Sequence, residues 1–107
     1  MIWHPHLEER WKTFPVHQQI LMICNELNRA ENLQSDTKEY KNALERALEL
    51  MDFTIDDPKN HSCLREILRA RRLMAGYYID KSPRSAKKLQ HGLVQLSSMA
   101  WLLLGGG

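Results

Sequence analysis

The stretch 86-AKKLQHGLVQLSSMAWLLL-104 decides the fold class of this chain of 107 residues. Its apolar residues recur at alternating steps of three and four, which is the spacing of an amphipathic helix whose apolar stripe faces a core. The stripe consists of Ala86, Leu89, Leu93, Leu96, Ala100 and Leu103. We therefore predict a core-facing helix at this end of the chain.

Three earlier segments repeat the same period, so we predict long helices over residues 15–33, 36–54, 58–80 and 83–104, with a short helix over about 5–12. Asp36 and Glu39 have the spacing of a capping box. Because the connections are short, consecutive helices pack antiparallel. The expected fold is all-α: an antiparallel up-down-up-down four-helix bundle with a short extra N-terminal helix. It forms one domain, 1–107, with 1–14 as an N-terminal helical cap and 105–107 as a flexible tail.

The composition, 43% hydrophobic and 26% charged, is that of an ordinary globular protein. No apolar run reaches the ~20 residues of a membrane span, and the first residues lack a secretory signal, so a cytoplasmic protein is expected. Cys24 and Cys63 have no paired spacing and are expected to be buried thiols. His4 and His6 would point apart on a helix. We therefore expect no metal site and no cofactor.

Charge is distributed unevenly along the chain. Residues 1–57 carry 6 Lys and Arg against 11 Asp and Glu, whereas residues 58–107 carry 9 against 2. Such asymmetry indicates either an anionic partner for the basic half or mutual neutralisation of the two halves in the fold. We expect Arg65, Arg69 and Arg72 to pair with acidic residues of the helix over 36–54. In the register of an antiparallel pair, Glu45 would lie near Arg65 or Arg69, and Glu39 near Arg72.

A second basic group is the better candidate for a functional surface. We expect it along the seam between the helices over 58–80 and 83–104, without a carboxylate. Such a seam would suit a phosphate, an acidic peptide or a nucleic-acid backbone. Its residues are Arg71, Tyr78, Arg84, Lys87, Lys88 and His91.

Within this group, 84-RSAKKLQH-91 has an arginine and a histidine separated by six residues. The string resembles the Arg-to-His motif of HEPN-domain proteins, helical bundles that often act as ribonucleases or as partners of nucleotidyltransferases. The resemblance covers eight residues. It implies that Arg84 would brace a phosphate and that His91 would act as acid and base.

Apolar residues at the two ends of the chain are predicted to meet at one pole of the bundle. There the N-terminal helix would fold under the bundle onto the end of the last helix, and otherwise the exposed patch would form a homodimer. The residues are Trp3, Leu7, Trp11, Trp101, Leu102 and Leu104. Gly76 and Gly92, both inside predicted helices, are expected where helices pack closely.

Taken together, these features predict a non-enzymatic bundle that acts by protein–protein interaction, with another protein or with a second copy. Nucleic-acid binding, or a HEPN-like ribonuclease activity of toxin type, through the basic half is the alternative.

Overall fold

The computed structural model describes residues 5–80 and 83–104 of the chain. In these two stretches the chain forms helices and no strand, so the prediction of an all-helical fold is confirmed. None of the helices in these stretches is long and apolar enough to cross a membrane. The elements are α1 (Pro5–Trp11), α2 (Val16–Asn32), α3 (Thr37–Ile55), the 3-10 helix η1 (Pro58–Cys63), α4 (Leu64–Ile79) and α5 (Lys87–Leu104).

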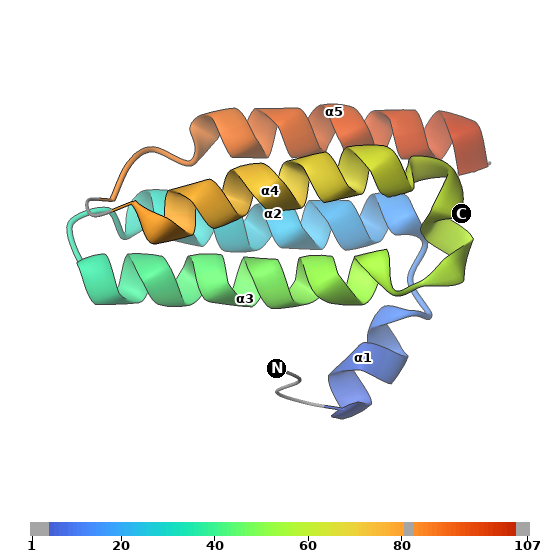
Figure 1. The fold of residues 1–107 in the computed structure, drawn as a ribbon, viewed down its shortest axis with the longest axis horizontal. Coiled ribbons are helices and arrows are strands. Elements are labelled where there is room, and N and C mark those ends of the chain that lie inside the picture. Colours follow the sequence, from blue (N-terminus) through green and yellow to red (C-terminus); the bar gives the residue numbers. More distant parts are fainter. Residues whose placement is uncertain (1–4, 81–82, 105–107) are drawn as a thin grey trace.

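The four long helices, α2 to α5, lie side by side along the longest axis of the molecule (Figure 1). α2 packs against α3 and α5, and α4 packs against the same two helices. Buried apolar side chains from all four form one core cluster. Of the four seams between neighbouring long helices, the seam between α2 and α5 is the most extensive and the seam between α4 and α5 is the least extensive. The packing between the four helices is therefore uneven, although the core side chains of the α4–α5 seam are buried.

The bounds of α2 and α3 agree with the prediction to within one residue at each end. In α2 the apolar stripe enters the core, where Ile20, Ile23 and Leu27 are fully buried. At the start of α3, Asp36 Oδ1 accepts from the N–H of Glu39 at 3.2 Å, as expected of a helix cap. Local sequence signals therefore specify both helices.

The third long helix begins later than predicted, because residues 58–63 form η1 instead of the first turns of an α-helix. Asp57 caps this segment by accepting from the N–H of Lys59 at 3.1 Å. The buried side-chain amide of Asn60 donates to Gln19 Oε1 at 3.0 Å and to the Thr54 carbonyl at 2.9 Å. The chain thus crosses the pole of the molecule through η1, and α4 begins only at Leu64.

The last helix also begins later than predicted, at Lys87 instead of Pro83. Residues 83–86 are not helical because their polar groups bond to other elements. The Tyr40 hydroxyl donates to the Arg84 carbonyl at 2.8 Å and accepts from its N–H at 3.3 Å. The Glu31 carboxylate accepts from the Ala86 N–H at 2.6 Å and from the Ser85 hydroxyl at 2.8 Å.

The short helix α1 packs against α3 and lies away from α5 (Figure 1). Trp11 is only 1% exposed, and its indole N–H donates to Thr54 Oγ1 at 2.9 Å. Leu7 packs against the core, whereas Leu102 is 81% exposed. The prediction that α1 covers Leu102 is therefore wrong, since the bond to Thr54 directs α1 to the end of α3. Trp3 and the side chains of Trp101 and Leu104 lie outside the described residues.

Candidate functional site

Arg71 and Tyr78, predicted to lie on the seam with α5, face α3 instead. Arg71 forms an ion pair with Asp52, with Nε 2.7 Å from Oδ1, and this hydrogen bond raises the pKa of the guanidinium. The Tyr78 hydroxyl donates to Glu45 at 3.2 Å, and the bond raises the pKa of the phenol. The predicted seam without carboxylates is therefore wrong for these two residues.

A shift in register explains this result. The prediction placed Glu45 level with Arg65 or Arg69, but its partner in the structure is Tyr78. That residue lies about three helical turns farther along α4. The shift arises because residues 58–63 cross the pole as η1. The helix that packs against α3 therefore begins at Leu64 instead of residue 58.

Arg84 is held by neighbouring residues at the connection between α4 and α5. Its guanidinium lies 3.7 Å from the centroid of the Tyr77 ring and forms a 3.0 Å ion pair with Asp80. On the other side of the connection, Lys41 donates to the carbonyls of Tyr78 and Asp80 at 2.6 and 3.0 Å. These contacts fasten the end of α4, so Arg84 has a clear structural role.

Lys87, Lys88 and His91 are exposed on the first turns of α5. The ring Nε2 of His91 lies 3.4 Å from the Gln95 side-chain nitrogen. Arg84 lies before α5 and His91 lies on it, so they do not share one helical face as the predicted helix over 83–104 required. Of the predicted basic group, only Lys88 lines the groove between α4 and α5.

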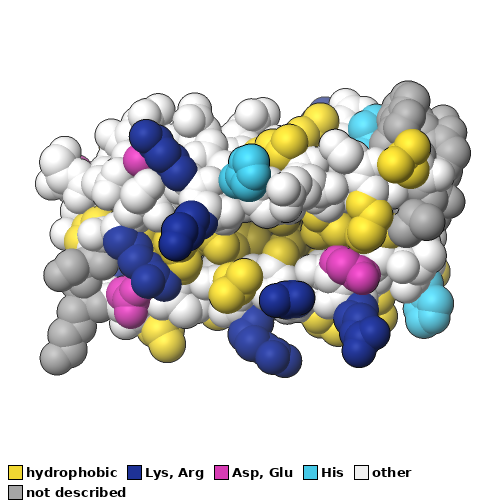
Figure 2. Space-filling model, turned by 90° about the horizontal axis from the view of Figure 1, so that it is seen from above, with side chains coloured by type: hydrophobic (Ala, Val, Ile, Leu, Met, Phe, Trp, Pro, Cys, Tyr) yellow, Lys and Arg dark blue, Asp and Glu magenta, His cyan; other side chains and the backbone are white. Residues whose placement is uncertain are grey.

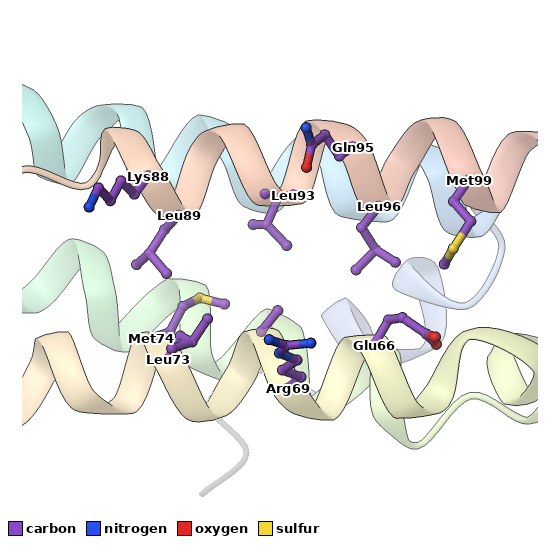
Figure 3. Close-up of a pocket in the computed structure, with 12 residues that line it drawn as sticks. Glu66, Arg69, Leu73, Met74, Lys88, Leu89, Leu93, Gln95, Leu96 and Met99 are labelled. Atoms are coloured by element: carbon purple, nitrogen blue, oxygen red, sulfur yellow. The ribbon is translucent and has the colours of Figure 1, made fainter.

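A groove of about 450 Å³ follows the seam between α4 and α5, which is the least extensive of the four. Figure 3 shows Leu89, Leu93 and Leu96 pointing from α5 toward α4, where Met74 lies opposite Leu89. These four residues are buried, but Leu73 on the α4 side is 53% exposed. The groove therefore has an apolar floor that continues into an exposed apolar edge.

Basic side chains stand on both sides of this floor (Figure 2). Arg69 lines the groove from α4 and Lys88 lines it from α5, and Glu66 is the acidic residue in its lining. Within residues 5–80 and 83–104, neither Arg69 nor Lys88 has an ion pair. The prediction that Arg69 pairs with α3 is therefore wrong, and the same holds in this part of the chain for Arg65 and Arg72.

Gly92 lies on the wall of the groove and is exposed. A Cβ atom added at Gly92 or at Gly76 would have no heavy atom of another element within 4 Å. The prediction that these glycines allow close helix contact is therefore wrong. Glycine inside a helix costs about 1 kcal/mol relative to alanine, and no packing contact among residues 5–80 and 83–104 explains the glycine at either position.

The remaining reactive side chains of the described residues offer no second site. Cys24 and Cys63 are buried and unpaired, as expected. Burial raises the pKa of the Cys24 thiol to about 11 and raises that of Cys63 as well, so both stay protonated at neutral pH. In the two described stretches, no three His, Cys, Asp or Glu side chains lie close enough together to hold a metal ion.

Sequence reasoning found Lys88 but missed the rest of the groove. Leu73 adjoins the core stripe of α4 without belonging to it, and Gly92 interrupts a helix of good helix formers. These two departures from the helical pattern were the features of the sequence that could have indicated the groove, since neither residue contributes to the core. Searches of protein-family models, of curated proteins and of solved structures found no match to this chain.

Proposed function

We propose that this protein is a non-enzymatic, antiparallel up-down-up-down four-helix bundle that works by binding another protein. The groove between α4 and α5 is its binding surface. One observation carries the proposal: the seam between α4 and α5 is the least closely packed, and it leaves an apolar groove of about 450 Å³ open along the molecule. An exposed apolar groove with a polar rim is typical of a protein-binding or ligand-binding site.

The lining of the groove supports binding over catalysis. Among the described residues that line it, the groove holds one carboxylate, one guanidinium, one amine and one amide beside apolar side chains, and none of these residues is a cysteine, serine or histidine. The HEPN-like alternative would need Arg84 and His91 to face one phosphate. In the structure Arg84 is engaged by Tyr77 and Asp80, which favours a structural role for it.

Nucleic-acid binding is the second candidate, because one observation favours it. Arg65, Arg69 and Arg72 form an exposed stripe on α4 and have no ion pair within the described part of the chain. Three adjacent cations of this kind would interact with a phosphate backbone. Nucleic-acid binding would leave the apolar floor of the groove beside these arginines without a role.

A photo-crosslinking experiment in the native cell tests the proposed function. A photoreactive phenylalanine analogue replaces Leu73 at the edge of the groove or, as the control, Ile79, which is 76% exposed on the same helix but outside the groove. We expect a discrete protein adduct from position 73, resistant to nuclease, and none from position 79. Adducts that disappear after nuclease treatment would favour the second candidate, and equal crosslinking from both positions would contradict a binding groove.

A further inference from the structure

The chemistry of the groove indicates what kind of protein segment it takes. Resting on the function proposed above, we infer that the occupant is an acidic amphipathic helix of a partner protein. Its apolar stripe would lie on the floor formed by Leu89, Leu93 and Leu96, with carboxylates reaching Arg69 and Lys88 on the two rims.

The dimensions of the groove fit a short helix. The α5 wall runs from Lys88 to Met99, which corresponds to about three helical turns. Figure 3 shows the apolar side chains of this wall at successive turns, facing α4. A helix laid into such a groove presents anchors at positions i, i+3 or i+4, and i+7. An occupant of about three turns would therefore cover the floor.

The charges on the rims select an acidic occupant. Arg69 and Lys88 stand on opposite walls, both are exposed, and neither has an ion pair within residues 5–80 and 83–104. α5 contains no aspartate or glutamate. Glu66 lies at the other end of the groove, beside Leu96 and Met99 (Figure 3). The carboxylates of the occupant are thus expected near Lys88 and Arg69, away from Glu66.

Gly92 adds a second, independent observation. It is exposed on the groove wall, and apart from its chain neighbours and the nearby backbone of α5, no atom of the described residues lies within 4 Å of the position where a Cβ would be. Small residues at helix interfaces let two backbones approach closely. A helix seated in the groove would use this opening, whereas the folded chain alone has no use for it.

A second copy of the chain fits the same rims poorly. In a symmetric dimer the same groove of both copies meets, so two copies of Arg69 and Lys88 would come together with only two Glu66 carboxylates among these residues to balance them. Like charges brought together in an interface disfavour it. Charge complementarity therefore favours an acidic helix from a different protein.

The test selects helices from a displayed library of peptides of about 16 residues. Each peptide has apolar residues fixed at i, i+3, i+4 and i+7, and Glu, Lys, Gln or Ala randomised elsewhere. Selection on the wild-type protein should enrich Glu over Lys beside the apolar stripe. Selection on the Arg69→Glu, Lys88→Glu double variant should reverse this preference.

Gly92→Gln, with Gly76→Gln as matched control, establishes where the selected peptides bind. Both substitutions add the same side chain at a helical position where an added Cβ would contact no other described element. Of the two glycines, only Gly92 lines the groove. Gly92→Gln should weaken binding of the selected peptides by at least about tenfold, and Gly76→Gln should leave it unchanged. Circular dichroism of both variants confirms that they are folded.

The outcomes separate this inference from the proposed function. Peptides that Gly92→Gln displaces but that show no preference for Glu would overturn the acidic occupant and leave the binding groove intact. No enrichment, or peptides insensitive to Gly92→Gln, would overturn both. A concentration-dependent dimer abolished by Gly92→Gln in sedimentation, or single-stranded RNA whose binding requires Arg65 and Arg72, would name a different occupant and overturn the inference.

Discussion

Gln19 is a polar residue on the core side of α2, where it is fully buried. Its side-chain N–H donates to the Trp11 carbonyl at 2.7 Å, and its oxygen accepts from Asn60 at 3.0 Å. One side chain therefore ties the end of α1 and the 3-10 helix η1 to α2.

Gln19→Leu should destabilise the protein by about 2–3 kcal/mol, because it leaves a buried carbonyl and a buried amide hydrogen without these partners. Urea unfolding measures the change. Gln18→Leu is the control, since Gln18 is exposed one position earlier in α2, and its effect should stay within about 0.5 kcal/mol. Equal losses for the two variants would show that the network contributes nothing specific.

Asp57 provides a prediction about acid stability. Burial alone would raise the pKa of this carboxyl, but hydrogen bonds and charge from Lys59 lower it below its ordinary value of 3.8. A lowered pKa in the folded state contributes stability above the unfolded pKa, and that contribution is lost as the pH falls through the folded pKa. Urea unfolding at pH 7 and pH 3 should therefore show a smaller loss of stability on acidification for Asp57→Asn than for the wild type. Asp56→Asn, at the exposed neighbouring residue, controls for removal of one negative charge, and an unchanged acid loss in Asp57→Asn would contradict the assignment.

At the scale of single elements, α5 depends on a carboxylate from another helix. Glu31 at the end of α2 accepts from Ser85 and Ala86 immediately before α5 begins. The first turn of α5 contains no acidic residue and begins with Lys87 and Lys88, whose charges oppose the helix dipole. Glu31 therefore supplies the negative charge that this helix start lacks.

Glu31→Ala should destabilise the protein by about 1–2 kcal/mol, as expected for loss of a helix cap, and Glu31→Gln should cost less because it keeps an acceptor. Native-state hydrogen exchange should show lost protection at the amides of residues 86–90. Glu9→Ala, the same substitution at an exposed position of α1, should change stability by no more than about 0.5 kcal/mol and leave that protection unchanged. Retained protection in Glu31→Ala would mean that α5 starts without this cap.

The elements also show where sequence reasoning succeeded and where it could not. The bounds of α2 and α3 were predictable because the apolar period and the Asp36 cap are local. The late starts of α4 and α5 were not, because the bonds responsible come from distant residues. Gln19 is 41 positions from Asn60, and Tyr40 is 44 positions from Arg84. Pro58 precedes an apolar period, and this local pattern fits the start of an α-helix and a 3-10 helix equally well. Only the distant hydrogen-bond partners distinguish the two.

At the scale of the whole molecule, the unpredicted late start of α4 displaced the predicted functional surface. The register between α3 and α4 depends on how many residues cross the pole. The prediction treated the residues of η1 as part of the α-helix, and it therefore placed Arg71 beside α5 instead of α3. Its partner Asp52 lies on the acidic helix α3. Lys88 kept its predicted position on the α4–α5 side because that seam is joined directly by the connection after Asp80. The groove itself could not be predicted from the sequence. All the long helices have the same apolar period, so the period does not show which pair of helices packs less extensively.

A pair of double-mutant cycles tests this register. Arg71→Gln combined with Asp52→Asn should show a coupling of about 0.2–1 kcal/mol, the range for exposed ion pairs. Arg72→Gln combined with Glu39→Gln, the pair that the sequence-based register would join, should show none. Thermal or urea unfolding of the six variants gives both values. Coupling in the second cycle alone would restore the predicted register.

The contacts between α2 and α5 have a mechanical consequence. α2 begins and α5 ends at the same pole (Figure 1). Their bonds follow one another along the seam, from His17–Ser97 through Cys24–Gln90 and Asn28–Gln90 to the carboxylate of Glu31 at Ser85. A pulling force on the two ends of this pair would load these bonds one after another, peeling α5 from α2 as a zipper opens. The helix pair should therefore yield at low force, and the carboxylate at the far pole would be the last attachment to break.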